Sequence, residues 1–294
     1  MIAHLYLINN SFLWNNSDKL ADFQLKMANF QKMMERINMY PEENLLYVIF
    51  DSFISTTILE NLTISDIITD YDKAIETIGK DAYVILMAII NRCKSTNASD
   101  EDIKEYLTLE DAENCHGVIV FSRIKGINNH VQVLSSEQGW FDFRRHHLGK
   151  YPHNPEYFLI ESTKYFPNLS IHPDNAGSMR DVIKTHPIQI IQYLSSLNDH
   201  FRKEFDNSKK DLKEFLPLFA LKHELDGASL DGNKDKKFYF IFSENGRIIQ
   251  AYCEAHLKMF HDDHGNANQH CRIYFKKPIM GEPYIYVGYI GEHL

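Results

Sequence analysis

The chain has 294 residues, a formal net charge of −9 and ordinary fractions of apolar (44%) and charged (24%) residues. This length allows one large α/β domain or two smaller ones, and the composition excludes bulk disorder. The acidic balance argues against a protein that grips DNA through a broad basic surface. Four scattered cysteines do not form a disulfide framework, and neither a signal-peptide pattern nor an apolar run of membrane length is present. We therefore expect a cytoplasmic protein.

Strand-like and helix-like segments alternate in the first half of the chain. Apolar runs at residues 2–8, 45–54 and 117–124 are typical of buried strands, and residues 18–39 and 71–93 have helical spacing. This alternation favours an α/β layer arrangement.

A polar stretch with two prolines and one glycine, residues 149–156, is the expected domain boundary. It would separate an α/β domain (1–150) from a second segment (151–294), although a loop inside one continuous domain explains the same stretch. Beyond it, residues 155–165, 178–205 and 208–219 are expected to be helical, the last interrupted at Pro217. Residues 226–237 are expected to form a polar loop.

The last sixty residues predict four antiparallel strands, at 237–243, 247–259, 271–276 and 284–290. Asn245 and Gly246 form the strongest short hairpin signal, and short connections make a meander the simplest topology. The expected fold class is α/β or α+β, with a mixed N-terminal α/β region, a helical middle and a C-terminal four-strand antiparallel meander.

Polar side chains gather on one face of this predicted meander, because successive side chains of a strand point to opposite faces. If the second and third strands pair as neighbours, their polar positions meet. Such a set suits phosphodiester chemistry without a metal or cofactor. Histidine or glutamate can act as acid or base, lysine and arginine stabilise developing negative charge, and tyrosine can stack on a base.

The expected catalytic residues are Glu254, His256, Lys258, Arg272 and Tyr274, and the expected substrate-binding residues are Tyr252, His261, His264, Lys276 and His293. The alternative is a plain solvated surface, because an antiparallel sheet normally has one wet polar face.

Three further patterns suggest other chemistry. His256-x-Lys258-x-x-x-x-Asp263 has the spacing of the phospholipase D superfamily motif, but the Gly-Ser that should follow is absent. Cysteine and histidine at 253, 256, 270 and 271 could suggest zinc, although adjacent residues and residues three apart face opposite sides of a strand. The basic run at residues 144–147, with Lys150 and His153, could contact phosphate or an acidic partner, or it could lie in a solvated loop.

The end of the chain, residues 252–258, 272–275 and 286–294, resembles the tail of uncharacterised bacterial proteins from mobile or phage-defence gene islands. It also resembles the terminal strands of RelE-like toxins, in which an Arg- or Lys-bearing strand precedes a strand ending in Val-Gly-His. Tyr289 stands here where that histidine often lies. The resemblance implies a defence or toxin setting.

We therefore expect a bacterial defence or toxin-like nuclease that acts on RNA or DNA phosphodiesters. One alternative is a non-catalytic subunit that docks a partner such as an ATPase, and another is a sensor of nucleotides or other anionic ligands. The expected partners are nucleic acid or protein, with no membrane, and the sequence does not define an oligomeric state.

Overall fold

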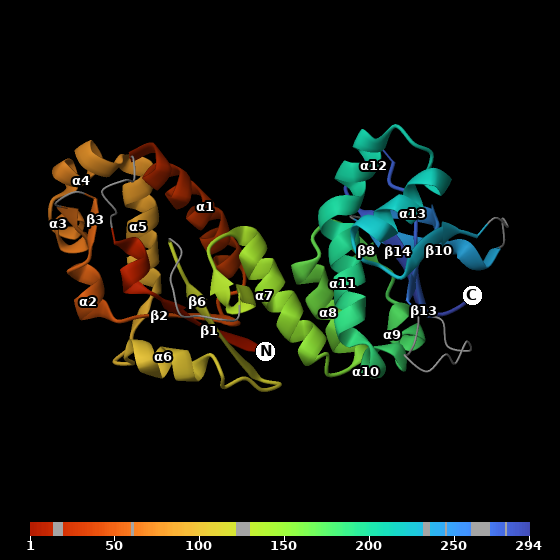
Figure 1. Ribbon diagram of the computed structural model, residues 1–294, viewed down its shortest axis with the longest axis horizontal. Helices are drawn as coiled ribbons and strands as arrows, with labels where there is room; N and C mark the ends of the chain where they lie inside the picture. Colours follow the sequence, from red (N-terminus) through yellow and green to blue (C-terminus); the bar gives the residue numbers. More distant parts are fainter. Residues whose placement is uncertain are drawn as a thin grey trace. The chain divides into compact units, whose positions relative to one another are not determined.

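The computed structural model describes residues 1–13, 20–59, 62–121, 130–231, 236–244, 246–259, 271–279 and 281–294. The chain divides into unit 1, Met1–Arg144, and unit 2, Arg145–Leu294, and the division falls inside helix α7 (Glu137–Lys150). The predicted fold class is confirmed, because unit 1 contains a parallel sheet and unit 2 a mostly antiparallel one (Figure 1). Among the described helices, none is both long and apolar enough to cross a membrane.

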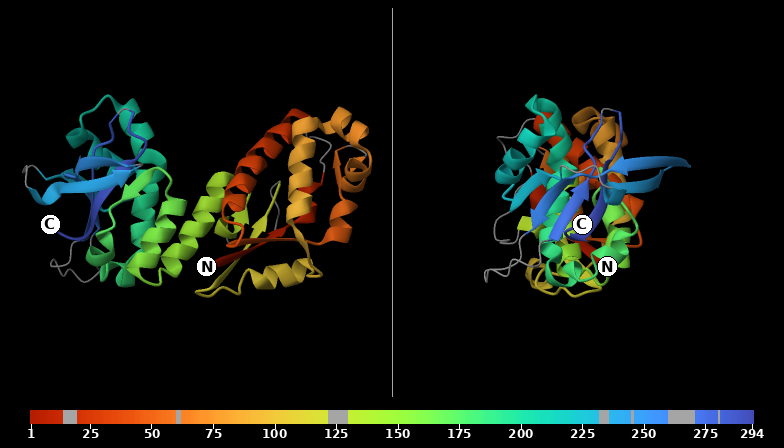
Figure 2. Two further views of the ribbon diagram at one scale, coloured as in Figure 1. Left: turned by 180° about the vertical axis from the view of Figure 1, so that it is seen from behind. Right: turned by 90° about the vertical axis from the view of Figure 1, so that its right-hand side faces the viewer.

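Unit 1 is built on a five-stranded parallel sheet in the order β5-β2-β1-β6-β7. Its strands are β1 (Ile2–Leu7), β2 (Asn44–Val48), β5 (Lys94–Ser95), β6 (Asn114–Ile119) and β7 (Val133–Leu134). Figures 1 and 2 show α1 (Leu20–Met39) and α5 (Lys80–Arg92) on one side of this sheet and α6 (Asp100–Tyr106) on the other. The predicted α/β layering is thus the architecture of this unit.

Two predicted elements of unit 1 are shorter than expected. The strand predicted at 45–54 ends at Val48, and α2 (Phe50–Ile54) follows it. The helix predicted at 71–93 is two helices, α4 (Tyr71–Ile78) and α5, because Gly79 between them has φ 85°, a left-handed conformation that ends a helix. The short elements between these segments are η1 (Asn9–Phe12), β3 (Thr57–Leu59), β4 (Leu62–Thr63) and α3 (Ile64–Thr69).

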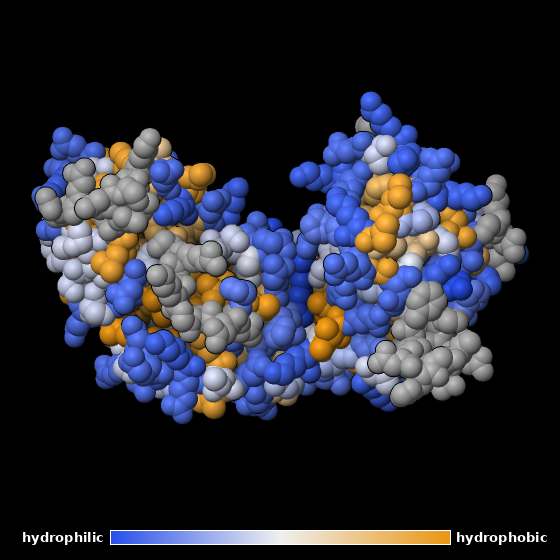
Figure 3. All heavy atoms as spheres, in the orientation of Figure 1, coloured by the Kyte–Doolittle hydropathy of each residue, from blue (hydrophilic) through white to orange (hydrophobic). Residues whose placement is uncertain are grey.

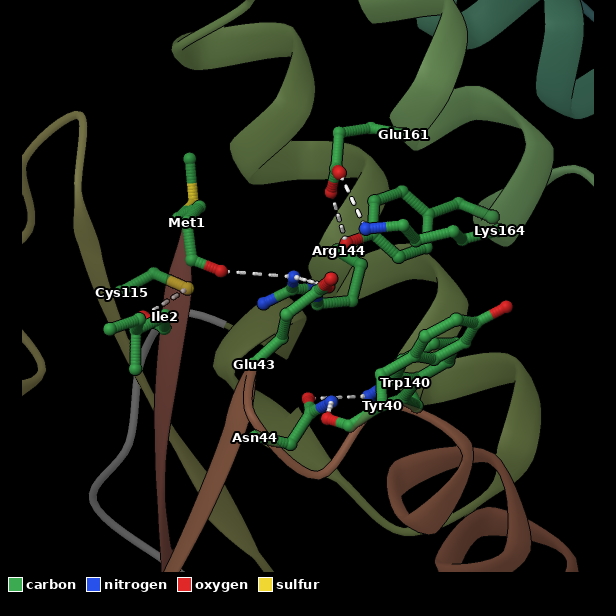
Figure 4. Close-up of polar contacts among 11 residues, drawn as sticks. Met1, Ile2, Tyr40, Glu43, Asn44, Cys115, Trp140, Arg144, Glu161 and Lys164 are labelled. Carbon is green, nitrogen blue, oxygen red and sulfur yellow. Dashed lines mark hydrogen bonds and ion pairs between the residues drawn. The ribbon is translucent and has the colours of Figure 1, made fainter. Parts of the chain in front are cut away.

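The basic run at residues 144–147 lies in α7, so the expected solvated loop is wrong. Arg144 is buried and donates to the Met1 carbonyl and to Glu43, both at 3.2 Å (Figure 4). One turn earlier, Trp140 Nε1 donates to Asn44 Oδ1 at 3.2 Å. These bonds fix α7 to the first two strands of the sheet, and the Arg144 guanidinium already has a carboxylate partner.

Arg145, the first residue of unit 2, forms a buried ion pair with Asp199. Its Nη1 and Nη2 lie 2.6 and 3.0 Å from the two Asp199 oxygens, and its Nε donates to the Tyr165 carbonyl at 2.9 Å. Asp199 stands in a π-helix, η3 (Leu197–Phe201), within the region predicted as one helix at 178–205. That region is in fact a succession, α10 (Val182–Thr185), α11 (Pro187–Ser196), η3 and α12 (Arg202–Ser208).

The other described helices of unit 2 are α8 (Pro155–Tyr165), α9 (Asn175–Ser178), α13 (Leu212–Lys222) and the short 3-10 turn η4 (Lys236–Phe238). Unit 1 also has a 3-10 turn, η2 (His130–Gln132), directly before β7. α8 matches its prediction, with Asn154 capping its N-terminus and Pro155 in its first turn. α13 continues through Pro217 instead of breaking there.

The C-terminal sheet has the order β8-β14-β13-β12-β9. β8 (Leu169–Ile171) runs parallel to β14 (Ile285–Glu292), and β13 (Cys271–Phe275), β12 (Ala255–Met259) and β9 (Gly227–Leu230) continue the sheet in antiparallel fashion. The strand predicted at 247–259 is two strands, since β11 (Arg247–Tyr252) leaves this sheet and pairs with β10 (Tyr239–Glu244). The loop predicted at 226–237 contains β9, which was not expected.

The β10–β11 hairpin forms a separate two-stranded sheet that packs on the C-terminal sheet (Figure 2). The ring centroids of Phe238 and Tyr274 lie 5.5 Å apart, and those of Phe242 and Tyr286 lie 4.9 Å apart. Between these contacts, Phe240 lies against Gly288, where an added Cβ would come within 2.3 Å of the phenyl ring. A glycine is therefore required for the hairpin to approach this closely.

We expect Gly288→Ala to lower the free energy of unfolding by about 1–3 kcal/mol, because the new methyl overlaps the Phe240 ring and the hairpin must shift. Gly177→Ala is the matched control, since nothing lies within 4 Å of its added Cβ. Its effect should stay within about 1 kcal/mol. Denaturant unfolding compares the two variants, and equal stabilities would contradict the close packing of Phe240 on Gly288.

Candidate functional site

The two strands that carry the expected catalytic residues pair as neighbours. The register of β12 and β13 places His256 opposite Tyr274 and Lys258 opposite Arg272. The face is not solvated at its centre, because His256 is only 1% exposed and Tyr274 is fully buried. Phe238 of the turn before the hairpin packs on Tyr274, which explains that burial.

Strand β9 adds two residues that the sequence interpretation missed. Ser229 lies opposite His256 across the β9–β12 pair, and its Oγ is 2.9 Å from His256 Nε2. Asp231 follows β9 directly, and its Oδ2 lies 3.6 Å from both His256 Nδ1 and Arg272 Nη1. Arg272 Nη1 also donates to the Tyr274 hydroxyl at 3.1 Å. We call these five residues, Ser229, Asp231, His256, Arg272 and Tyr274, the His256 cluster.

The backbone at Glu254 fixes the cluster from the side of β12. The Asp231 amide donates to the Glu254 carbonyl at 3.1 Å, and His256 Nδ1 lies 3.4 Å from the same carbonyl oxygen. One tautomer of His256 satisfies these contacts: Nδ1–H points to the carbonyl and Asp231, and Nε2 accepts from the Ser229 hydroxyl. The sequence analysis expected the Glu254 side chain to take part in the site, whereas the structure uses the Glu254 backbone carbonyl to hold Asp231 and His256.

The imidazole of His256 is uncharged at neutral pH. Burial lowers its pKa to about 4, and the charges of Arg272 and Lys258 act in the same direction, whereas Asp231 opposes them. Burial also raises the pKa of Tyr274 to about 12, so its hydroxyl stays protonated. A neutral imidazole whose Nε2 lone pair accepts from the Ser229 hydroxyl can act as a base toward that hydroxyl.

The order of contacts, serine to histidine to aspartate, is the order found in hydrolytic triads. The separation of 3.6 Å between Asp231 and His256 Nδ1 exceeds a normal hydrogen bond, so Asp231 acts here through its charge. Asp231 Oδ2 is buried and has no hydrogen-bond partner among the described residues. Leaving such an oxygen without a hydrogen bond costs free energy, and His256 Nδ1–H and the Arg272 guanidinium, each 3.6 Å away, are the donors that would satisfy it after a small shift.

The remaining predicted site residues lie around this cluster or apart from it. Lys258 is half-buried next to Arg272, and its carbonyl accepts from the Tyr193 hydroxyl at 2.9 Å. Tyr252 belongs to the hairpin and borders the cluster through Phe238. Lys276 is paired with Glu282 and lies over the Tyr286 ring, and His293 is exposed beyond β14. His261 and His264 lie outside the described residues.

The alternative zinc site is not supported by the two cysteines beside the cluster. Burial raises the pKa of Cys253 and of Cys271 to about 12 each, so neither thiol ionises easily to the thiolate that zinc requires. Within the described ranges, no three histidine, cysteine or carboxylate side chains are grouped to hold a metal. His270 and Asp263, which the zinc and phospholipase D patterns need, lie outside those ranges.

The depressed pKa of His256 predicts a pH-dependent stability. Between pH 6.5 and about 4 the unfolded chain binds a proton at this residue and the folded chain does not, so stability falls as the pH is lowered through that window. We expect the loss attributable to His256 to be roughly 2–3 kcal/mol. Denaturant unfolding of wild type and His256→Gln across pH 4–7.5 measures it. The difference between the two proteins should shrink toward low pH, and a constant difference would contradict the buried neutral imidazole.

No protein-family model, no curated protein and no solved structure matches this chain. The function of the cluster is therefore inferred from its geometry and chemistry.

Proposed function

We propose that the chain is a metal-independent hydrolase of phosphodiesters, with the His256 cluster as its catalytic site. The observation that carries this proposal is the 2.9 Å contact between Ser229 Oγ and Nε2 of a neutral histidine. The nearby guanidinium of Arg272 and the ammonium of Lys258 favour an anionic substrate over a neutral ester. A cytoplasmic defence or toxin setting, as the C-terminal resemblance implies, belongs to the same proposal.

In the first step, Ser229 Oγ attacks phosphorus while His256 Nε2 takes its proton. The bond from phosphorus to the leaving alkoxide breaks, and the imidazolium gives its proton to that oxygen. In the second step His256 deprotonates a water that attacks the phosphorus of the seryl phosphodiester, and the bond from phosphorus to Ser229 Oγ breaks. The imidazolium returns its proton to that oxygen, and a phosphate monoester is released. Asp231 stabilises the transient imidazolium, because a negative charge 3.6 Å away favours the charged form.

In this mechanism the substrate reaches the cluster at Ser229, beside the partly exposed Asp231 and Arg272. The histidine and the tyrosine are buried, whereas Ser229 is half-exposed on the edge strand of the sheet. A phosphodiester that approaches the serine brings its negative charge toward Arg272. That charge raises the pKa of the imidazole from its low value and makes His256 a stronger base during the reaction.

We expect Ser229→Ala and His256→Gln each to lower kcat/KM by at least about 100-fold, because each removes one partner of the proton transfer. The substrates are a single-stranded RNA, a single-stranded DNA of the same sequence and bis(p-nitrophenyl) phosphate, all with EDTA present. Ser243→Ala is the matched control, since Ser243 is exposed on β10 and belongs to the hairpin. Its activity should equal that of wild type.

The two nucleic acids separate the serine mechanism from one in which the ribose 2′-hydroxyl is the nucleophile. Cleavage of RNA alone that survives Ser229→Ala and is lost in His256→Gln would overturn the serine step. Wild type that cleaves none of the three substrates would overturn the hydrolase itself. That result would favour the docking of a protein partner or the sensing of an anionic ligand.

A further inference from the structure

Unit 2 contains a second polar site, a pocket of about 430 Å³ between α12 and α13. Figure 3 shows a largely hydrophilic surface where α12 lies. Six polar residues line the pocket, and Phe215 forms an apolar part of its wall. The polar residues are His200, Lys203, Glu204, Asn207, Ser208 and Lys222.

The π-helix η3 determines which of its side chains reaches the pocket. A π-turn inserts an extra residue into a helix, so it changes the direction of the side chains that follow. Asn198 Oδ1 accepts from the Asn168 amide at 2.8 Å, Asp199 pairs with Arg145, and Phe201 is fully buried. His200 alone of these four is exposed, and it lines the pocket. The contacts of Asn198 and Asp199 and the burial of Phe201 hold this turn in place, and the His200 side chain with it.

His200 and Glu204 line the pocket, and His223, which is not part of the lining, contacts both of them from behind. The His200 and His223 rings are stacked, with centroids 4.8 Å apart and an interplanar angle of 19°. His223 Nε2 lies 3.2 Å from Glu204 Oε1, and the same oxygen is 2.7 Å from Lys222 Nζ. Burial alone would raise the pKa of Glu204, but its contacts with Lys222 and His223 outweigh that effect and lower it. Glu204 is therefore ionised and fixes the Lys222 ammonium at the rim.

The charge of the pocket is positive although the chain carries −9 overall. Lys203 and Lys222 supply two ammonium groups against the single carboxylate of Glu204. Among the described residues, the Lys203 ammonium has no hydrogen bond or ion pair, so it can bind a ligand without giving up another contact. Burial lowers the pKa of His223, and an anion bound in the pocket would raise it again because its charge stabilises the protonated ring.

We propose that this pocket binds a phosphomonoester dianion, such as inorganic phosphate or the phosphate of a nucleoside monophosphate. The Lys203 and Lys222 ammonium groups can both pair with phosphate oxygens, and the His200 imidazole and the Asn207 amide supply further donors. A volume of about 430 Å³ lies within the range of pockets that hold small ligands. The site is independent of the proposed hydrolase activity, because none of its residues belongs to the His256 cluster.

Titration calorimetry with inorganic phosphate and with AMP, at low ionic strength, tests the proposal. We expect Lys203→Met to weaken the binding of both probes at least tenfold, because it removes an ammonium that makes no bond within the described protein. Lys213→Met is the matched control: this exposed lysine also lies in a helix of the pair, at the start of α13, but does not line the pocket. Its affinity should equal that of wild type.

The proton NMR resonances of the His223 ring provide a second readout. The effect of the probes on them would be the same in both proteins if Lys203 had only a structural role. We expect either probe to raise the pKa of His223 in the wild type, followed by proton NMR, and to raise it less in Lys203→Met. Tighter binding of AMP than of phosphate would identify a nucleotide site, and equal binding would identify a site for the phosphate group alone. No binding of either probe, or equal affinity in Lys203→Met and wild type, would overturn the proposal. Because catalysis is not measured, loss of hydrolase activity in Ser229→Ala leaves the result unaffected.

Discussion

The buried ion pair between Arg145 and Asp199 is the interaction on which the arrangement of unit 2 depends. The Arg145 and Asp199 side chains are only 2% and 14% exposed, so both charges are removed from water at a large cost. The cost is offset because the guanidinium is bidentate on the carboxylate, donates to the Tyr165 carbonyl and lies 4.7 Å over the Phe166 ring. The Asp199 carboxylate stands in η3, so the ion pair also holds the π-helix in place. The side chains beside Asp199 are Asn198, which bonds Asn168 just before β8, Phe201, which is buried, and His200, which lines the surface pocket.

The sequence interpretation succeeded where the signal is local and failed where it depends on distant partners. Alternation along the strands predicted at 247–259 and 271–276 placed His256, Lys258, Arg272 and Tyr274 on one face, and the structure pairs His256 with Tyr274 and Lys258 with Arg272. β9 was missed because Gly227–Leu230 is four residues long and has little apolar periodicity, so Ser229 and Asp231 could not be recognised. The change of sheet at Cys253 was missed because the chain stays extended there, with the Cys253 amide bonded to the Phe238 carbonyl. Periodicity identifies the two faces of a strand, but it does not show what covers them.

Two consecutive residues of strand β13 contact the surroundings of the two sites from opposite faces of the sheet. Tyr274 belongs to the His256 cluster, whereas Phe275 points to the opposite face and contacts Phe201 of η3 at 4.9 Å between ring centroids. Phe201 is the neighbour of His200, which lines the α12–α13 pocket. The sheet therefore separates the proposed catalytic chemistry from the proposed anion site, and one strand contributes to the support of both. A change in the packing of Phe275 would reach both sites at once.

The packing of the hairpin over Tyr274 influences the pKa of His256, the proposed base. A two-stranded sheet is marginal on its own, so β10 and β11 keep their structure through the packing of Phe238, Phe240 and Phe242 on the C-terminal sheet. Partial detachment of this ribbon costs less than global unfolding and would admit water beside Tyr274. Hydration would remove the main cause of the low pKa of His256. The proton affinity of the His256 imidazole is thus linked to the local folding equilibrium of the hairpin. The packing of Phe238, Phe240 and Phe242, which lie outside the cluster, sets that equilibrium.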